Sequence, residues 1–164
     1  AKGRRGITYT GYYRGEKVTI KRKRESSKAN RLEFEAGWLK KIPFAPELLF
    51  SGKNYLVYKY IEGITMKEFL KKPEPDKMFR ILNELLEQAH ELDKMGIDKE
   101  EMHRPFTNVL VSDKAHLIDF ERARYTEHPK NVTQFCQFLY GHRKLLREAG
   151  IDVSENILSA AKEY

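Results

Sequence analysis

Residues 108–121, NVLVSDKAHLIDFE, decide the fold class of this chain. Two short apolar runs, 109–111 and 116–118, are separated by a polar turn, which predicts a small β-hairpin. Asn108 precedes this hairpin and Asp119 follows it. Oxygen-bearing side chains are the ligands that hard cations such as Mg²⁺ prefer. The stretch therefore predicts a hairpin whose two ends carry magnesium ligands.

Strand patterns dominate the first part of the chain and helix patterns the second. Alternating residues rich in Thr, Tyr, Val and Ile predict strands, and apolar residues at helical spacing predict helices, the first capped by Ser26 or Ser27. We expect an α+β fold in which an antiparallel sheet with one helix (residues 1–62) precedes a shortened, mainly helical part (residues 63–164) of one domain. The expected strands are 6–24 (a hairpin), 47–50, 55–60, 109–111 and 116–118, and the expected helices are 26–41, 65–71, 76–95, 131–149 and a last one after Val153.

The charge of the chain indicates its class of partner. It carries 31 Lys and Arg against 24 Asp and Glu in 164 residues, a net charge of +7, and basic residues crowd the first fifth. Such a surface favours polyanions, although Lys and Arg are also frequent in thermostable proteins.

The apolar segments of the sequence bear on its location. No apolar run reaches the about twenty residues of a membrane span, and the basic start lacks a following apolar stretch, so we expect a soluble, cytoplasmic protein. The one cysteine, Cys136, lies among apolar residues and is expected to be a buried spectator.

Two charged residues upstream of the hairpin fit the same chemistry. Lys21 ends the run Val-Thr-Ile-Lys on a predicted strand, and Glu35 lies on the following helix. A Lys on the strand and a Glu on the helix can pair and hold the ammonium against phosphate groups. Glu33 competes for this role, but it lies about 200° round the helix from Glu35, so only one of them should face the cleft.

In this order, Lys21, Glu35, Asn108 and Asp119 resemble the protein-kinase-like superfamily, and the likeness runs from residue 3 to about residue 124. The chain is most similar to the small atypical archaeal branch related to the RIO-type kinases. This resemblance implies a two-lobed fold that binds ATP and Mg²⁺, with Asn108 and Asp119 as the metal ligands.

The resemblance also implies how the nucleotide is held. The backbone near Lys59 to Ile61 would face adenine, with Tyr58 guarding the pocket. Gly3 and Gly6 stand in an abbreviated glycine-rich loop whose amides and basic side chains would cover the phosphates.

One departure from ordinary kinases concerns catalysis. His103 stands five residues before Asn108, where those enzymes carry the catalytic Asp. Either activity has been lost, or the imidazole acts as base and orienter. Because phosphoryl transfer depends mainly on positioning and charge, we favour His103 as a working residue beside Lys21 and Asp119, with Glu100 and Glu101 as fallback bases.

A second departure concerns the acceptor. Neither an activation loop nor an Ala-Pro-Glu motif follows Asp119, and these parts normally hold a peptide substrate. A site left open in this way, with basic residues beside it, suits a folded polyanion such as RNA. The expected RNA-binding residues are Arg4, Arg5, Arg22, Arg24, Arg104, Arg122, Arg124 and Lys130.

Three short stretches narrow the likeness further. His103-Arg104-Pro105 with Asn108, IDFERA at 118–123 and NVTQ at 131–134 are similar to the archaeal RNA kinase family. Members of that family use ATP to phosphorylate the ribose 2′-hydroxyl of a tRNA uridine in the variable region. The resemblance implies a monomeric tRNA 2′-O-kinase. A small serine/threonine protein kinase and an RNA-binding pseudokinase are the alternatives.

Two groups of polar residues stay open at the level of the sequence. Tyr9, Tyr12 and Tyr13 either stack on bases or pack within the hairpin. The segment that begins at Asn131 and includes Gln134 either faces the cleft or caps a helix.

Overall fold

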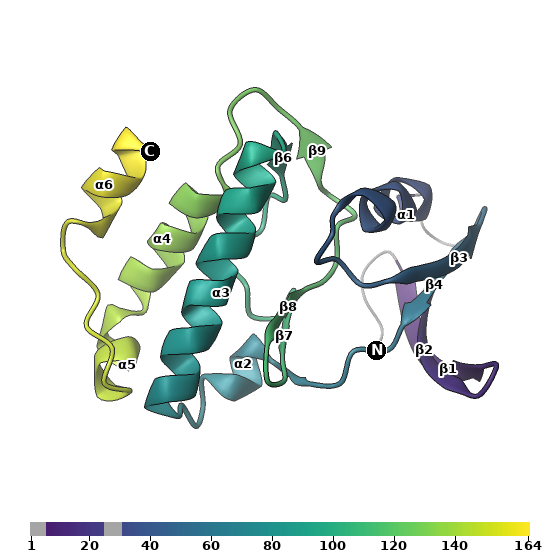
Figure 1. The fold of residues 1–164 in the computed structure, drawn as a ribbon, viewed down its shortest axis with the longest axis horizontal. Helices are drawn as coiled ribbons and strands as arrows, with labels where there is room; N and C mark the ends of the chain where they lie inside the picture. Colours follow the sequence, from purple (N-terminus) through teal and green to yellow (C-terminus); the bar gives the residue numbers. More distant parts are fainter. Residues whose placement is uncertain (1–5, 25–30) are drawn as a thin grey trace. The chain divides into compact units, whose positions relative to one another are not determined.

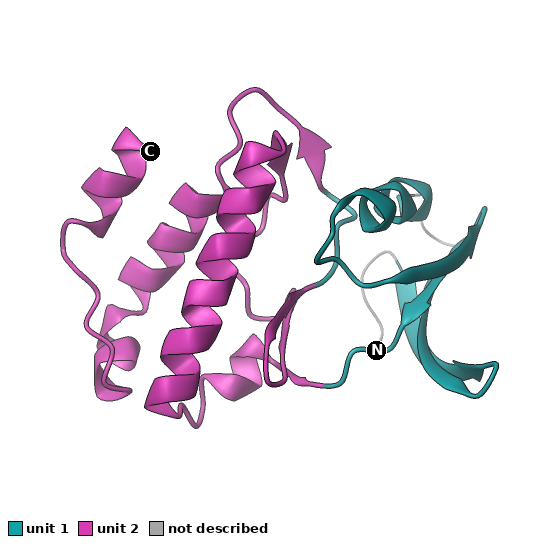
Figure 2. Cartoon of the chain, in the orientation of Figure 1, with its two compact units in different colours: residues 1–62, 118–122 teal, residues 63–117, 123–164 magenta. Residues whose placement is uncertain are grey.

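The computed structural model describes residues 6–24 and 31–164, which form a mixture of helices and antiparallel strands. The chain divides into two compact units (Figure 2). Unit 1 comprises residues 1–62 and 118–122, and unit 2 comprises residues 63–117 and 123–164. Unit 1 therefore takes a short second segment from far along the chain.

Unit 1 is built on a four-stranded antiparallel sheet of order β1-β2-β4-β3. A two-residue turn joins β1 to β2, and both its residues, Arg14 and Gly15, have positive φ angles (52° and 83°). These φ values are those of the hairpin turn that matches the right-handed twist of strands. The strands are β1 (Gly6–Tyr13), β2 (Glu16–Lys23), β3 (Leu48–Gly52) and β4 (Tyr55–Lys59).

Helix α1 (Leu32–Lys41) covers one face of this sheet and contacts β2, β3 and β4. Its buried residues include Ala36, Trp38 and Leu39, which recur at helical spacing. The strand residues Leu56 and Tyr58, 0% and 5% exposed, belong to the covered face. The expected caps Ser26 and Ser27 lie outside the described residues.

Unit 2 centres on the long helix α3 (Pro75–Lys94), which lies beside α4 (Asn131–Gly141) (Figure 1). Pro75 opens α3, where its fixed φ suits the first helical turn and its missing N–H costs nothing. Gly96, with a φ of 68°, follows the end of the helix. The buried face of α3 consists of Met78, Ile81, Leu82, Leu85, Ala89 and Leu92.

The hairpin predicted for residues 109–118 lies in unit 2 as β7 (Val109–Val111) and β8 (Ala115–Leu117). Its first strand also pairs with β5 (Ile64–Thr65), just before the short helix α2 (Met66–Phe69). A two-stranded ladder of β6 (Ile97–Asp98) and β9 (Arg124–Tyr125) was not expected, because two-residue strands leave no period to detect.

The region expected to be helical over 131–149 is helical, but it is not one continuous helix. Two helices, α4 and α5 (Arg143–Glu148), meet at His142, whose φ and ψ of −111° and 14° are not helical. The preceding Gly141 has low helix propensity, and His142 Nδ1 lies 2.9 Å from the Phe138 carbonyl oxygen, which ends the first helix. A final helix, α6 (Ile157–Glu163), packs against α4. Among the described residues, no helix has the length and apolarity needed to cross a bilayer.

Candidate functional site

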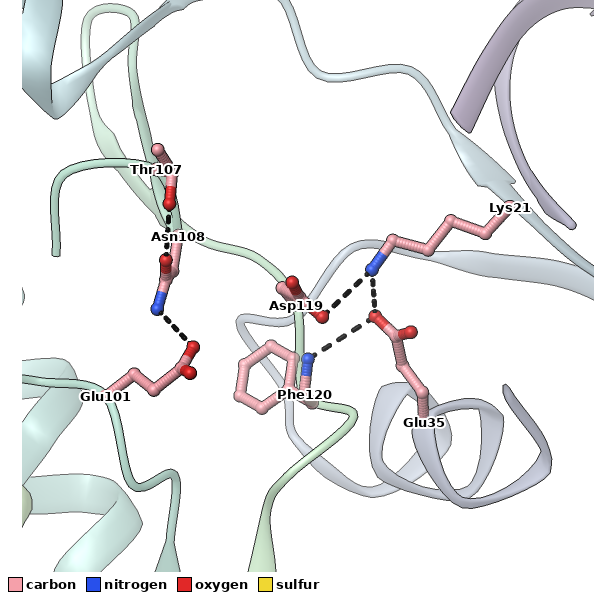
Figure 3. Close-up of polar contacts among 7 residues, drawn as sticks. All are labelled: Lys21, Glu35, Glu101, Thr107, Asn108, Asp119 and Phe120. Carbon is pink, nitrogen blue, oxygen red and sulfur yellow. Dashed lines mark hydrogen bonds and ion pairs between the residues drawn. The ribbon is translucent and has the colours of Figure 1, made fainter. Parts of the chain in front are cut away.

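In unit 1, β2 directs Lys21 toward α1. Alternate residues of a strand point to opposite faces, so Thr19 and Lys21 share the face that α1 covers. Lys21 Nζ lies 2.6 Å from Glu35 Oε1 and 3.2 Å from Asp119 Oδ1 (Figure 3). The Lys21 side chain is 14% exposed. One ammonium group is thus held between two carboxylates that come from separate parts of the chain.

Glu35 is the fixed partner of this ammonium. Its side chain is 1% exposed, and the Phe120 amide donates to Oε1 at 3.3 Å. The second carboxylate oxygen, Oε2, is buried without a hydrogen-bond partner among the described residues. Glu33 is exposed on the other side of α1, so helix geometry selects Glu35 as the partner of Lys21.

Asp119 is the accessible carboxylate of the group, with a side chain that is 41% exposed. Its backbone has a φ of 65°, in the left-handed region that non-glycine residues seldom occupy. Such a conformation costs of order 1–3 kcal/mol and persists where the surroundings impose it, often at functional sites. The next residue, Phe120, is fully buried and holds the backbone in place.

The protonation of Lys21 follows from these contacts. Burial by itself lowers the pKa of Lys21, but the negative charges of Glu35 and Asp119 more than offset this, and the pKa of Lys21 is raised well above its ordinary value. Burial raises the pKa of Glu35, and the Lys21 ammonium opposes that rise. Lys21 is therefore a permanent cation at any physiological pH.

In unit 2, Asn108 is held from both ends of its side-chain amide. Its Nδ2 donates to Glu101 Oε2 at 2.8 Å, and its Oδ1 accepts from Thr107 Oγ1 at 3.0 Å (Figure 3). Asn108 is 6% exposed and directly precedes β7. The contact with Glu101 orients the amide, since a carboxylate accepts only from the NH₂ group.

His103 lies on the same loop as Glu101 but has a different partner. The exposed His103 ring places Nδ1 3.4 Å from Gln134 Oε1, and the same oxygen accepts from the Met102 amide at 3.1 Å. Because an amide oxygen only accepts, the contact assigns the proton to Nδ1 in the neutral ring, which leaves Nε2 as the acceptor. Gln134 thus sets the orientation and tautomer of His103.

The loop of Glu101 and His103 is anchored to the first turn of α4. Asn131, fully buried, accepts from the Lys99 amide at 2.9 Å and donates through Nδ2 to the Ile97 carbonyl at 2.6 Å. Asp93, on α3, accepts from the Asn131 amide and from its Nδ2 (3.0 and 2.6 Å) and from the Val132 amide (3.0 Å). Asp93 therefore caps α4. The Asn131 side chain, fixed by this cap, in turn holds the backbone of the loop through Ile97 and Lys99.

Sequence reasoning missed this anchor and the burial of the loop that it holds. Lys99 is only 1% exposed, although nothing in its sequence context marks it as buried. Glu100 has a φ of 71°, which turns the chain between Lys99 and Glu101. Asp93 follows Leu92 as an ordinary polar residue of an amphipathic helix, so no local signal identifies it as a cap.

The residues expected near adenine lie in or just after β4. Tyr58 is buried and hydrogen-bonded to Thr19, and burial raises the pKa of its hydroxyl. Lys59 Nζ pairs with Glu47 Oε2 at 2.8 Å, and Ile61 is half-buried. The Tyr60 amide donates to the Lys17 carbonyl at 3.2 Å, which ties this segment to β2.

The expected glycine-rich loop is described only in part. Gly6 pairs with Lys23 in the β1–β2 ladder, and a Cβ at this position would lie 3.2 Å from the Arg22 carbonyl oxygen. Gly3 lies outside the described residues.

The expected RNA-binding residues divide between the units. Arg4 and Arg5 lie outside the described residues. Arg22, Arg24 and Arg122 belong to unit 1, and Arg104, Arg124 and Lys130 belong to unit 2. Arg22, Arg104, Arg122, Arg124 and Lys130 are exposed, Arg24 is half-buried, and Arg124 Nε lies 3.1 Å from Glu100 Oε1.

The side chains that most often bind metal ions do not cluster in the described part of the chain. No group of three or more His, Cys, Asp or Glu side chains there is arranged to hold a metal ion. Cys136 is buried, and burial raises the pKa of its thiol.

Comparison with known proteins shows a distant likeness to a protein of a methanogen. No protein-family model matches the chain. An uncharacterized protein of Methanocaldococcus jannaschii is 28% identical over 112 residues, which cover 65% of this chain and 97% of that protein. The name of this relative carries no information on its activity.

Proposed function

We propose that this chain is an ATP- and magnesium-dependent phosphotransferase with a protein-kinase-like fold, and that its acceptor is the ribose 2′-hydroxyl of a tRNA nucleotide. The contact of Lys21 with Glu35 and Asp119 carries the proposal. A buried ion pair is a weak way to stabilise a fold, because removing the charges of Lys21 and Glu35 from water offsets most of their attraction. The arrangement is better explained as a phosphate-binding device.

The two proposed magnesium ligands fit a hard cation in their chemistry. Asp119 offers a carboxylate on a partly exposed side chain. Asn108 directs its NH₂ group at Glu101 and so leaves its amide oxygen, which accepts one bond from Thr107, as the donor atom with a further lone pair. Bound magnesium would supply charge neutralisation on the phosphates, and Lys21 would hold the α- and β-phosphates.

The acceptor hydroxyl must lose a proton as its oxygen bonds to the γ-phosphorus and the bond to ADP breaks. His103 is one candidate for that proton, because its Nε2 is the accepting nitrogen. Glu101 is the second, and its 2.8 Å contact with Asn108 supports it, because a base beside a metal ligand lies near the reacting phosphate. Either residue would act as the general base in place of the catalytic Asp of ordinary kinases.

RNA is the proposed acceptor because of charge and resemblance together. The chain carries a net charge of +7, and the archaeal RNA kinases that it resembles act on tRNA. A small serine/threonine kinase would need contacts that hold a peptide. An RNA-binding pseudokinase would share the basic surface and lack turnover.

The test is transfer of label from γ-labelled ATP, with magnesium, to total archaeal tRNA and to generic protein acceptors. We expect label in tRNA, and we expect Asp119→Ala and Lys21→Met to abolish it. Lys17→Met is the matched control, because Lys17 lies on the same strand and face but contacts the Tyr60 ring.

The position of the label distinguishes the hydroxyl. A phosphate on an internal 2′-oxygen blocks attack on the adjacent phosphodiester, so alkaline hydrolysis should release the label in an alkali-resistant dinucleotide. Label that enters only protein would contradict the proposal and indicate a serine/threonine protein kinase. Tight tRNA binding without transfer of label to any acceptor would contradict the catalytic proposal and indicate an RNA-binding pseudokinase.

A further inference from the structure

The sheet of unit 1 has an aromatic face, which we define by Tyr9, Tyr13, Phe50 and Tyr55. The strand register places Tyr9, Ile20, Val57 and Phe50 in one row across all four strands. Directly paired residues point to the same side of a sheet, and Lys21 alternates with Ile20. The aromatic face is therefore the one opposite α1.

Its four rings are too exposed to be ordinary core residues. Tyr9, Tyr13, Phe50 and Tyr55 are 45%, 39%, 36% and 42% exposed. Three of them are in contact, because the Tyr13 and Phe50 ring centroids are 4.9 Å apart and those of Phe50 and Tyr55 are 6.4 Å apart, both edge to face. Tyr9 lies in register with Phe50 on the same face. The Tyr13, Phe50 and Tyr55 rings thus pack against one another and remain partly accessible.

Small residues beneath the rings shape this face. A Cβ at Gly52 would lie 2.6 Å from the Tyr55 ring, so the ring lies directly over that glycine. A Cβ at Gly11 would lie 3.3 Å from the Ile20 side chain in the same way. The glycines let the larger side chains lie flat against the sheet.

Positive charge borders the aromatic face. The Arg14 guanidinium lies 5.3 Å from the centroid of the Tyr13 ring, and Arg22 pairs in register with Tyr55 on the same face. Glu16 is the only acidic residue between Gly6 and Lys23, and Lys59 on this face is paired with Glu47. Rings bordered by arginines suit a ligand that alternates flat bases with phosphates.

We propose that the aromatic face binds unpaired nucleotides of the RNA by stacking their bases on Tyr9, Tyr13, Phe50 and Tyr55, with Arg14 and Arg22 near the phosphates. The proposal rests on RNA being the acceptor of the proposed function and adds the surface that holds a single-stranded part of it. Stacking is tolerant of sequence, because every base has a π-face.

The test measures binding by fluorescence anisotropy, without ATP or magnesium, so that a failure of phosphoryl transfer does not affect it. The probes are a single-stranded oligouridylate and an abasic oligomer with the same number of phosphates. We expect tighter binding of oligouridylate. Tyr9→Leu and Tyr55→Leu should each weaken it about tenfold and leave the abasic oligomer almost unchanged, because stacking contributes roughly 1–3 kcal/mol per base.

Three controls keep the outcome unambiguous. Tyr9→Phe keeps a ring and should keep affinity. Tyr12→Leu removes a ring that is 78% exposed on the opposite face, and it should have no effect. Thermal unfolding verifies that each variant is folded.

Equal binding of the two probes by the natural chain, or equal losses for both probes in the Leu variants, would overturn the proposal. Labelled tRNA in the transfer assay together with unaffected Leu variants would retain the RNA kinase and reject this surface alone. If an acidic peptide displaced both probes equally well, and the Leu variants bound that peptide less tightly, the aromatic face would instead be assigned to a protein partner.

Discussion

At the scale of single residues, the contacts of Lys21 show which parts of the site can be predicted from the sequence. Its run of β-branched neighbours predicted a strand, and the spacing of Glu35 on the next helix made a pair possible. Helix geometry then decided between Glu35 and Glu33, because only one of them can face the sheet. The second partner, Asp119, is 98 residues from Lys21, so no local pattern links the two, and the chemistry of the hairpin together with the resemblance brought Asp119 into the group.

The Lys21 pair separates stability from activity. Lys21→Met leaves Glu35 buried and uncompensated, so we expect a loss of about 3 kcal/mol in the free energy of unfolding, together with at least about a hundredfold loss of transfer. Adding Glu35→Gln removes the buried charge and should restore most of the stability but none of the activity. Chemical denaturation and the tRNA assay measure the two effects, and recovery of activity in the double variant would exclude Lys21 from the chemistry.

Glu101 and His103 compete for the role of base. We expect Glu101→Gln to lower kcat about a hundredfold or more, since a neutral amide cannot take the proton, and His103→Gln to lower it less. Glu100→Gln tests the other fallback base, and we expect it to have a smaller effect, because Glu100 contacts Arg124 instead of Asn108. Single-turnover rates with saturating ATP decide the question, and the reverse order of effects would assign the base to His103.

At the scale of elements, the sequence predicted what periodicity can encode. The long helix α3 and the hairpin of β7 and β8 were expected within a residue or so of their limits, because their patterns extend over whole elements. The division at His142 was missed because apolar residues continue at helical spacing on both sides of it. The caps of α4 come from Asp93 on another helix, and such long-range contacts leave no local signal.

The turn between β1 and β2 offers a test at this scale. Arg14 has a φ of 52°, which suits Asn far better than Arg, so Arg14→Asn should raise the free energy of unfolding by a few tenths to about 1 kcal/mol. The same change removes the guanidinium beside Tyr13 and should weaken oligouridylate binding. Thermal unfolding measures the expected gain in stability, and fluorescence anisotropy measures the expected loss of oligouridylate affinity. A variant that is more stable but binds oligouridylate as tightly as the natural chain would show that the Arg14 guanidinium does not contribute to binding.

At the scale of the whole molecule, the chain enters unit 1 twice. The order of strands and helices gave an α+β fold with its sheet first, but no pattern in the sequence showed that residues 118–122 belong with residues 1–62. That segment supplies the buried Phe120 ring and the Asp119 carboxylate to unit 1. The unit is therefore complete only after both pieces have been made.

A fragment experiment tests this dependence. Residues 1–62 alone should lack a cooperative unfolding transition, because the fragment lacks Asp119, which contacts Lys21, and the buried Phe120, whose amide donates to Glu35. Joining residues 118–122 through a flexible glycine-serine linker should restore cooperativity, and the same linker with those five residues scrambled should not. Circular dichroism during thermal unfolding gives the readout, and a cooperative transition in the short fragment would contradict the expectation.

The attachment of the loop at 97–103 to α4 has a consequence for protection against solvent. The amides of Lys99 and Met102 lie outside any helix or strand, yet each donates to a side chain of α4. Hydrogen exchange at these two amides should therefore be slow and should share the opening free energy of α4, as members of one cooperative foldon. Asp93→Ala should accelerate exchange in the loop and in α4 together. The segment that bears Glu101 and His103 therefore stays folded only while α4 stays folded.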